Sequence, residues 1–229
     1  MIGKPGQAHT KMKSHKPTRQ YGGVNADQRV FERREKFIAA GLEAFGVHGY
    51  NQSTIKTICG LAGLTERYFY ESFENKEALL CAVNRRLTDE LEMGARLIME
   101  TPGFSPEETV FMTVKSFYLL FLNNPRRARV QLFEVLGVSP RVDREYQDAV
   151  KRLSAQIGRN LTAVFPALDR EWLQKSILPM TMAGGMIANA HKWVLENFQT
   201  PIDDIVTQSV EMFMVIGGHY HAKRLSEEH

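Results

Sequence analysis

The sequence predicts an all-α protein of about nine helices, with a small N-terminal three-helix head and a larger helical body. Three observations lead to this prediction. Apolar residues recur with the 3.6-residue period of helices, and the alternation typical of strands is almost absent. Pro, Gly, Asn and Ser/Thr residues interrupt the pattern at intervals, as helix ends and caps do. An apolar fraction of 43% in 229 residues is sufficient for a packed core.

The first two helices follow from local signals. An apolar stripe predicts a helix over residues 28–48, and Gly49 ends it. Ser53 or Thr54 can cap a short second helix. Its core face is expected to consist of Ile55, Ile58 and Leu61.

Two further helices complete the head and join it to the body. Thr65 can cap a short third helix that runs from Glu66 to about Tyr70. A longer fourth helix is expected to open at residues 75–77 and to end near Glu100.

The body contains five more expected helices. The fifth begins at residues 105–108 with Pro106 in its first turn. The last two span residues 172–197 and 202–219. Turn residues divide the body at Thr101-Pro102-Gly103, Asn123-Asn124-Pro125, Gly137 to Pro140, Pro166 and Thr200-Pro201. The expected organisation is therefore a basic disordered arm over residues 1–27, a helix-turn-helix domain over 28–75, a helical domain over 76–220 and a tail over 221–229.

Charge is distributed unevenly along the chain. Residues 1–36 carry nine Lys/Arg against three acids, a net charge of +6, whereas the whole chain carries +3. A basic end on a mildly acidic body indicates that this end approaches a polyanion, and a disordered arm can follow a phosphate backbone.

Cysteine usage and hydropathy indicate the compartment. Cys59 and Cys81 form no CxxC pair, which favours a reduced cytoplasmic protein. No apolar run is long enough for a membrane span, and no signal peptide is expected. A membrane is therefore not among the expected partners.

Residues 53–80, STIKTICGLAGLTERYFYESFENKEALL, carry the main functional signal. Two short helices joined by Ala62-Gly63-Leu64 have the geometry of a helix-turn-helix, and Gly63 can adopt the positive φ of a tight turn. The start of the third helix would then face base edges in the major groove. Double-stranded DNA is the expected partner.

This segment resembles the TetR family of transcriptional regulators. The resemblance covers about residues 30–85. The residues in register with the family pattern are Thr54, Ile55, Ile58, Ala62, Gly63, Leu64, Thr65, Phe69, Tyr70, Phe73, Lys76, Glu77 and Leu79. The chain departs from the common form at Cys59, Gly60, Arg67, Tyr68 and Ser72. These departures change base preference, so the operator sequence does not carry over.

Eight residues are candidates for DNA binding. Arg67 can donate two hydrogen bonds to guanine. Glu66 can accept from cytosine or pair with a basic side chain of the protein, and Tyr68 can contact sugar or a thymine methyl or pack on the protein surface. Phosphate contacts are expected from Thr54, Thr65, Tyr70 and Lys76, the last forming an anion site with the start of the fourth helix, and Lys56 completes the set.

The resemblance implies that the body holds a cavity for a small-molecule effector and forms a homodimer through the last two helices. Aromatic and Met side chains in the body fit either a core or an apolar pocket for a hydrophobic or aromatic ligand. The pocket candidates are Phe117, Tyr118, Phe121, Phe133, Met182, Met186 and His191. A two-fold dimer predicts a palindromic operator, and the helix over residues 76–100 is the expected lever for effector-driven release.

The leading hypothesis is a ligand-responsive repressor. An activator or a low-specificity DNA-organising protein of the same fold is the alternative, and an enzyme that uses the C-terminal cavity is a remote one, because the chain has no GxSxG, GxGxxG, P-loop or HExxH motif. No catalytic residue, cofactor or metal site is expected. His191 is interpreted as a core or pocket-wall residue, and His219 and His221 as solvated side chains near a mobile end.

Overall fold

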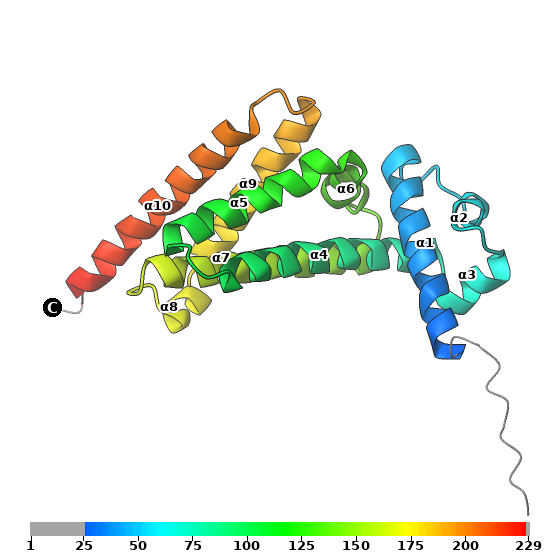
Figure 1. Cartoon of the computed structure of the whole chain (residues 1–229), viewed down its shortest axis with the longest axis horizontal. Helices are drawn as coiled ribbons and strands as arrows, with labels where there is room; N and C mark the ends of the chain where they lie inside the picture. Colours follow the sequence, from blue (N-terminus) through cyan, green and yellow to red (C-terminus); the bar gives the residue numbers. More distant parts are fainter. Residues whose placement is uncertain (1–25, 228–229) are drawn as a thin grey trace, which may run out of the picture.

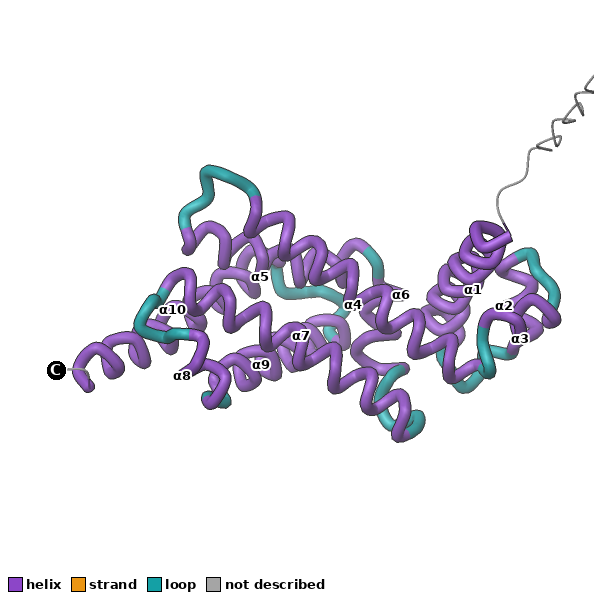
Figure 2. The backbone as a smooth tube through the Cα atoms, turned by 90° about the horizontal axis from the view of Figure 1, so that it is seen from below, coloured by secondary structure: helices purple, strands orange, loops and turns teal. Residues whose placement is uncertain are grey.

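The computed structural model describes residues 26–227, and all regular structure in this range is helical (Figure 2). The all-α prediction is confirmed. The helices in chain order are α1 (Ala26–His48), α2 (Ile55–Ala62), α3 (Glu66–Ser72), α4 (Lys76–Glu100), α5 (Pro106–Asn123), α6 (Pro125–Arg129), the π-helical turn η1 (Val130–Glu134), α7 (Pro140–Val164), α8 (Arg170–Lys175), α9 (Leu178–Leu195) and α10 (Ile202–Glu227).

The described part of the chain has ten α-helices where about nine were expected, because the segment over residues 172–197 is divided in two. α8 ends at Lys175, and Ser176 Oγ accepts a hydrogen bond from the backbone N–H of Leu178 at 3.1 Å. Pro179 then occupies the first turn of α9, where its missing N–H costs nothing.

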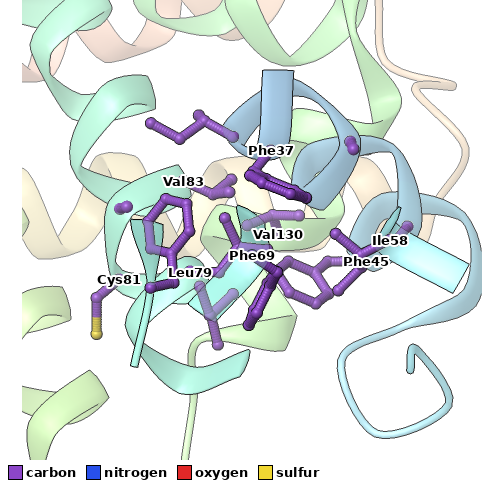
Figure 3. Packing of buried hydrophobic residues seen from close by; sticks show 14 of the residues in the cluster. Phe37, Phe45, Ile58, Phe69, Leu79, Cys81, Val83 and Val130 are labelled. Carbon is purple, nitrogen blue, oxygen red and sulfur yellow. The ribbon is translucent and has the colours of Figure 1, made fainter. Parts of the chain in front are cut away.

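The N-terminal helices enclose a compact aromatic core (Figure 3). Phe37 of α1 lies edge-on to Phe69 of α3, with ring centroids 5.4 Å apart, and Ile58 of α2 is fully buried beside them. α4 and η1 close this core with Leu79, Val83 and Val130. The start of α4 is therefore part of the same packed unit as α1–α3.

Leu61 does not belong to this core, contrary to the sequence prediction, and is 49% exposed. The buried stripe of α2 instead runs through Ile55, Ile58, Cys59 and Ala62. These residues have the i, i+3, i+4, i+7 spacing of one helix face, and Leu61 lies beside it.

The molecule is elongated, with α1–α3 at one end and the C-terminal end of α10 at the other (Figure 1). α4 and α7 run along its length, and α5, α9 and α10 complete the body. A second apolar core lies among these helices and includes Phe117, Phe121, Leu161 and Trp193. No helix within residues 26–227 is long and apolar enough to span a membrane.

The last helix continues to Glu227, so the expected tail from residue 221 is helical over its described part. His221 explains the extension, because its Nδ1 accepts a hydrogen bond from the backbone N–H of Ala167 at 3.3 Å and its ring packs on Phe165. The interpretation of His221 as a solvated side chain is therefore wrong, whereas His219 is exposed. The predicted basic arm falls, except for its last two residues, outside the described range.

Candidate nucleic-acid interface

A glycine turn sets the angle between α2 and α3. Gly63 has φ 64° and ψ 31°, a left-handed conformation that a side chain would strain. The N–H of Leu64 donates to the carbonyl of Cys59 at 3.1 Å, and the Leu64 side chain packs against the N-terminal core. Thr54 caps α2 by accepting a hydrogen bond from the N–H of Thr57 at 3.0 Å. Thr65, which was predicted to cap α3, occupies the N-cap position but accepts no hydrogen bond with its side chain there. α3 is instead held by the core that it shares with α2.

α3 presents one exposed face to solvent. Phe69 is fully buried and anchors the helix. The predicted recognition residues around it are all exposed: Thr65, Glu66, Arg67, Tyr68 and Tyr70. Lys56 and Thr54 are exposed on the preceding α2 segment. A helix of this size with one free polar face is the shape that enters a major groove.

Arg67 is the most available cation of this face. Its side chain is 85% exposed and its Nε lies 3.1 Å from Glu71 Oε1. An exposed pair of this kind contributes only about 0.3–0.5 kcal/mol, so the guanidinium can leave it for a base edge. Glu66 was considered as a partner for a basic side chain of the protein, but it forms no ion pair within residues 26–227. Glu71 forms such pairs instead, with Arg33 and Arg67.

Two arginines of α1 brace α3 from behind. The guanidinium of Arg33 lies 4.6 Å from the ring centroid of Tyr68, which favours the packing interpretation of this tyrosine. Arg34 donates to the carbonyl of Ser72 at 2.7 Å and stacks on Phe73. These contacts hold α3 against α1.

Lys76 is used within the protein. Its Nζ donates to the carbonyls of Tyr50 and Ser53 at 2.7 and 2.9 Å and lies 4.2 Å from the Tyr50 ring centroid. Partial burial lowers the pKa of this ammonium group. Asn75 caps the same helix start through the N–H of Ala78. The expected anion site at the start of α4 is thus occupied by contacts of the protein itself.

The described head carries no net positive charge. Residues 26–75 contain six basic side chains, Arg29, Arg33, Arg34, Lys36, Lys56 and Arg67. They also contain seven acids, Asp27, Glu32, Glu35, Glu43, Glu66, Glu71 and Glu74. The basic character of the N-terminal region therefore lies in residues 1–25, which contain five Lys/Arg and no acid.

A second connection between head and body, not predicted from the sequence, runs through η1. Glu134 of η1 accepts a hydrogen bond from the N–H of Tyr50 at 2.6 Å and pairs with Arg129 at 2.9 Å. Arg129 also donates to the carbonyl of Val47 at 2.7 Å. We call these contacts of Arg129 and Glu134 with the end of α1 the clamp. A Cβ at Gly49 would approach Arg129 to 2.9 Å, so the clamp requires glycine at this position.

Three adjoining cavities lie in the described body, and two of them are lined by α4. An inner one of about 50 Å³ lies among α4, α5, η1 and α7. It shares Thr88, Leu91 and Phe117 with a central one of about 40 Å³. The central one shares Met186 and Phe213 with a groove of about 300 Å³ between α9 and α10. The same helix, α4, thus contacts the head at its start and lines two of these cavities farther along.

The predicted pocket residues separate into several groups. Phe117, Phe121 and Met186 line the inner or central cavity, and Met182 lines the groove. Tyr118, by contrast, is fully buried in the core, where its hydroxyl lies 3.0 Å from Ser209 Oγ and its ring abuts Trp193.

The remaining two candidates lie on another face of the body. Phe133 stacks on His191 with ring centroids 4.3 Å apart, and His191 lines an outer groove between α7 and α9. Within residues 26–227 no three His, Cys, Asp or Glu side chains gather as metal ligands would.

The polar residues of the cavity walls were not predicted from the sequence. They are Asn84, Thr88, Thr113, Gln156 and Asn160, all buried on α4, α5 or α7. A signal existed for Asn84, because it interrupts the apolar stripe of Leu80, Val83 and Leu87 on the expected fourth helix.

Residues 37–83 match the family model described as bacterial regulatory proteins, tetR family. The N-terminal helices thus carry the sequence pattern of the tetR family. This match includes α2, the glycine turn and α3, and it ends within α4. No curated protein matches this chain.

Solved structures extend the likeness to the body. The fatty acid degradation regulator FadR from Bacillus halodurans is 16% identical, with a TM-score of 0.69 over 80% of this chain and 94% of that one. FadR from Bacillus subtilis in complex with stearoyl-CoA is 18% identical, with a TM-score of 0.66 over 78% and 96%. A tetR-family regulatory protein from Rhodococcus RHA1 is 17% identical, with a TM-score of 0.60 over 80% and 95%. The chain thus has the fold of TetR-family transcriptional regulators.

Proposed function

We propose that this TetR-type chain is a DNA-binding repressor that binds a palindromic operator as a homodimer and leaves it when a hydrophobic small molecule binds the body. The observation that carries the proposal is the exposed polar face of α3, mounted on a rigid head and free to enter a major groove. DNA contacts are assigned to Arg67, Thr65, Tyr70, Thr54 and Lys56. Lys76 is assigned to holding the head together.

Effector release would use the two connections between head and body. α4 enters the N-terminal core at its start and lines the cavities later, and the buried Arg127 of α6 ties it to the neighbouring helix through Glu90 at 2.8 Å. η1 contacts Tyr50 on one side and contributes Gln131 and Leu132 to the inner cavity. A ligand that favours another spacing of these elements would shift the population away from the DNA-binding form.

The effector is proposed to be a largely apolar molecule. The cavities and the groove are walled mainly by aliphatic and aromatic side chains of α4, α5, α7, α9 and α10. The structural relative from Bacillus subtilis holds stearoyl-CoA, which is consistent with a long apolar ligand in this fold.

A homodimer is proposed through α9 and α10. Gly184, Gly185 and Ala188 lie exposed on α9, and Met212 and Val215 lie exposed on α10. Small residues permit close approach of a partner helix, and exposed apolar side chains supply the contact area. Two copies would place their α3 helices about a two-fold axis, as a palindrome requires.

The first test is titration of the protein against a fluorescent duplex that carries the palindromes upstream of its own gene, with random DNA as competitor. Arg67→Ala should weaken operator binding by about tenfold or more, since a bidentate guanine contact contributes about 1–3 kcal/mol. Arg96→Ala is the matched control, because Arg96 is an exposed arginine of α4 far along the chain from α3. Equal binding of operator and random DNA, unaffected by Arg67→Ala, would refute the specific repressor.

That outcome would favour the alternative of a low-specificity DNA-organising protein. The observation in its favour is the concentration of basic residues in positions 1–25 beside a head without net positive charge. Such a protein would show a steep fall of affinity with salt and little operator preference. An activator would bind the operator specifically and raise, rather than lower, transcription of a reporter.

A further inference from the structure

Asn84 is a buried polar residue whose amide N–H group has no partner in the described part of the chain. Its side chain is on α4, the residue is 2% exposed, and its Nδ2 has no hydrogen-bond acceptor within residues 26–227. Leaving a buried amide donor unpaired costs about 1–3 kcal/mol. Asn160 of α7 offers a contrast, because it is buried to a similar degree but donates to Thr113 Oγ1 at 3.0 Å.

Asn84 lines the inner cavity, which provides the space for a missing acceptor. The cavity volume of about 50 Å³ exceeds the roughly 10–15 Å³ that one water needs. Thr88, Gln131 and Tyr146 add polar groups to the wall, and the rest of the wall is apolar. The site is thus a small pocket with a few polar groups in an otherwise apolar wall.

This pocket adjoins the surface on two sides. It shares Leu132, Tyr146 and Val150 with the outer groove between α7 and α9, and the central cavity connects it to the groove beside α10. The inner and central cavities share wall residues on α4, α5 and α7, and the central one adjoins the groove beside α10. An elongated molecule that enters from the groove beside α10 would therefore reach Asn84 with one of its ends. A simple hydrocarbon end would leave the amide unpaired.

The charges around the inner and central cavities favour a neutral ligand. No charged residue lines the inner cavity. In the central cavity Arg152 is already paired with Glu92 at 2.9 Å and with Asp89 at 2.7 Å. A buried carboxylate would lack a free counter-charge there, whereas a neutral carbonyl needs only a hydrogen-bond donor.

We infer that the effector is a neutral, elongated apolar molecule with a carbonyl oxygen at one end, and that Asn84 Nδ2 donates to this oxygen. This inference rests on the proposed function, since it assigns the chemistry of the effector in the same body. Ketones, esters and amides fit it, and free carboxylates do not.

The test uses 2-octanone and octanoate as probes, with calorimetry of the full-length protein without DNA. The wild type should bind 2-octanone more tightly than octanoate. Asn84→Leu should weaken 2-octanone binding about fivefold to tenfold, the value of one hydrogen bond. Failure of wild-type protein to bind 2-octanone, or equal affinity of both proteins, would overturn the inference.

Thermal unfolding separates ligand recognition from a role in folding. Asn84→Leu removes an unpaired donor and should leave the melting temperature unchanged or raise it, whereas Asn160→Leu removes paired hydrogen bonds and should lower it. An equal fall in both variants would show that Asn84 has a structural partner and would overturn the inference. Because no DNA is present, a negative result here leaves the operator titration as an independent test of the repressor.

Discussion

At the scale of single residues, the two cysteines show how burial controls chemistry in the N-terminal core. Cys59 of α2 is 6% exposed and Cys81 of α4 is 5% exposed, and both are free thiols. Burial raises the pKa of both thiols; the carboxylate of Glu66 adds to the effect at Cys59, and that of Glu145 adds to it at Cys81. The reactive thiolate is therefore scarce at neutral pH.

We predict that neither cysteine reacts measurably with Ellman's reagent in the native protein at pH 7.5 within minutes. Both should react in concentrated urea, which exposes them and restores their ordinary pKa values. The absorbance of the thiolate released from the reagent gives the number of cysteines that have reacted. Rapid reaction of one thiol in the native state would instead support a redox-sensing role.

Lys76 shows why residue types alone did not assign every side chain of the site. An exposed lysine at a helix start is a reasonable phosphate contact from sequence. The two carbonyls that accept hydrogen bonds from its ammonium group belong to Tyr50 and Ser53 in the loop before α2. They lie 26 and 23 positions earlier in the sequence than Lys76. Such contacts depend on the tertiary fold, whereas the exposure of Arg67 follows from the local helix pattern and was predictable.

At the scale of elements, the clamp formed by α6 and η1 joins the body to the end of α1. It relies on Glu134, whose carboxylate accepts hydrogen bonds from the backbone N–H of Tyr50 and from the guanidinium of Arg129. The side chain of Glu134 is 17% exposed, so these bonds are only partly screened by solvent. A π-helical turn at this point brings Arg129 and Glu134 together at a spacing of five residues.

We predict that Glu134→Gln lowers the free energy of unfolding by about 1–2 kcal/mol, because a charge-assisted bond to a backbone N–H and an ion pair are both weakened. Glu171→Gln is the matched control. It removes a carboxylate from an exposed pair with Lys175 and should cost less than about 0.5 kcal/mol. Urea titrations measure both values. Similar stability of the two variants would mean that the clamp contributes nothing.

Most elements were predictable because their signals are local. Thr54, Asn75 and Ser105 cap helices where the sequence placed helix starts, and Ser105 forms a full capping box with Glu108. The break between α8 and α9, the π-helical turn and the extension of α10 were not predicted. Each depends on contacts with distant segments, such as Ala167 with His221, that periodicity does not report.

At the scale of the whole molecule, the arrangement predicts how assembly and DNA binding are linked. α1–α3 lie at one end, and α9 and α10 lie along one side of the body (Figure 1). A palindrome is read only if two heads are held at a fixed distance, so the proposed interface on α9 must control operator affinity. Gly184 is suited to test this, because a Cβ there meets no atom within 4 Å in the single chain.

We predict that Gly184→Arg halves the molecular mass measured by light scattering and weakens operator binding by more than about tenfold, because the second half-site then binds as a separate molecule. The fold should survive, because arginine has a higher helix propensity than glycine and the position is exposed. Ala155→Arg, an exposed position on α7, is the control and should remain dimeric. A dimeric Gly184→Arg variant would place the two-fold axis away from this face of α9. The exposed apolar side chains of α9 and α10 would then have to be covered by a different partner.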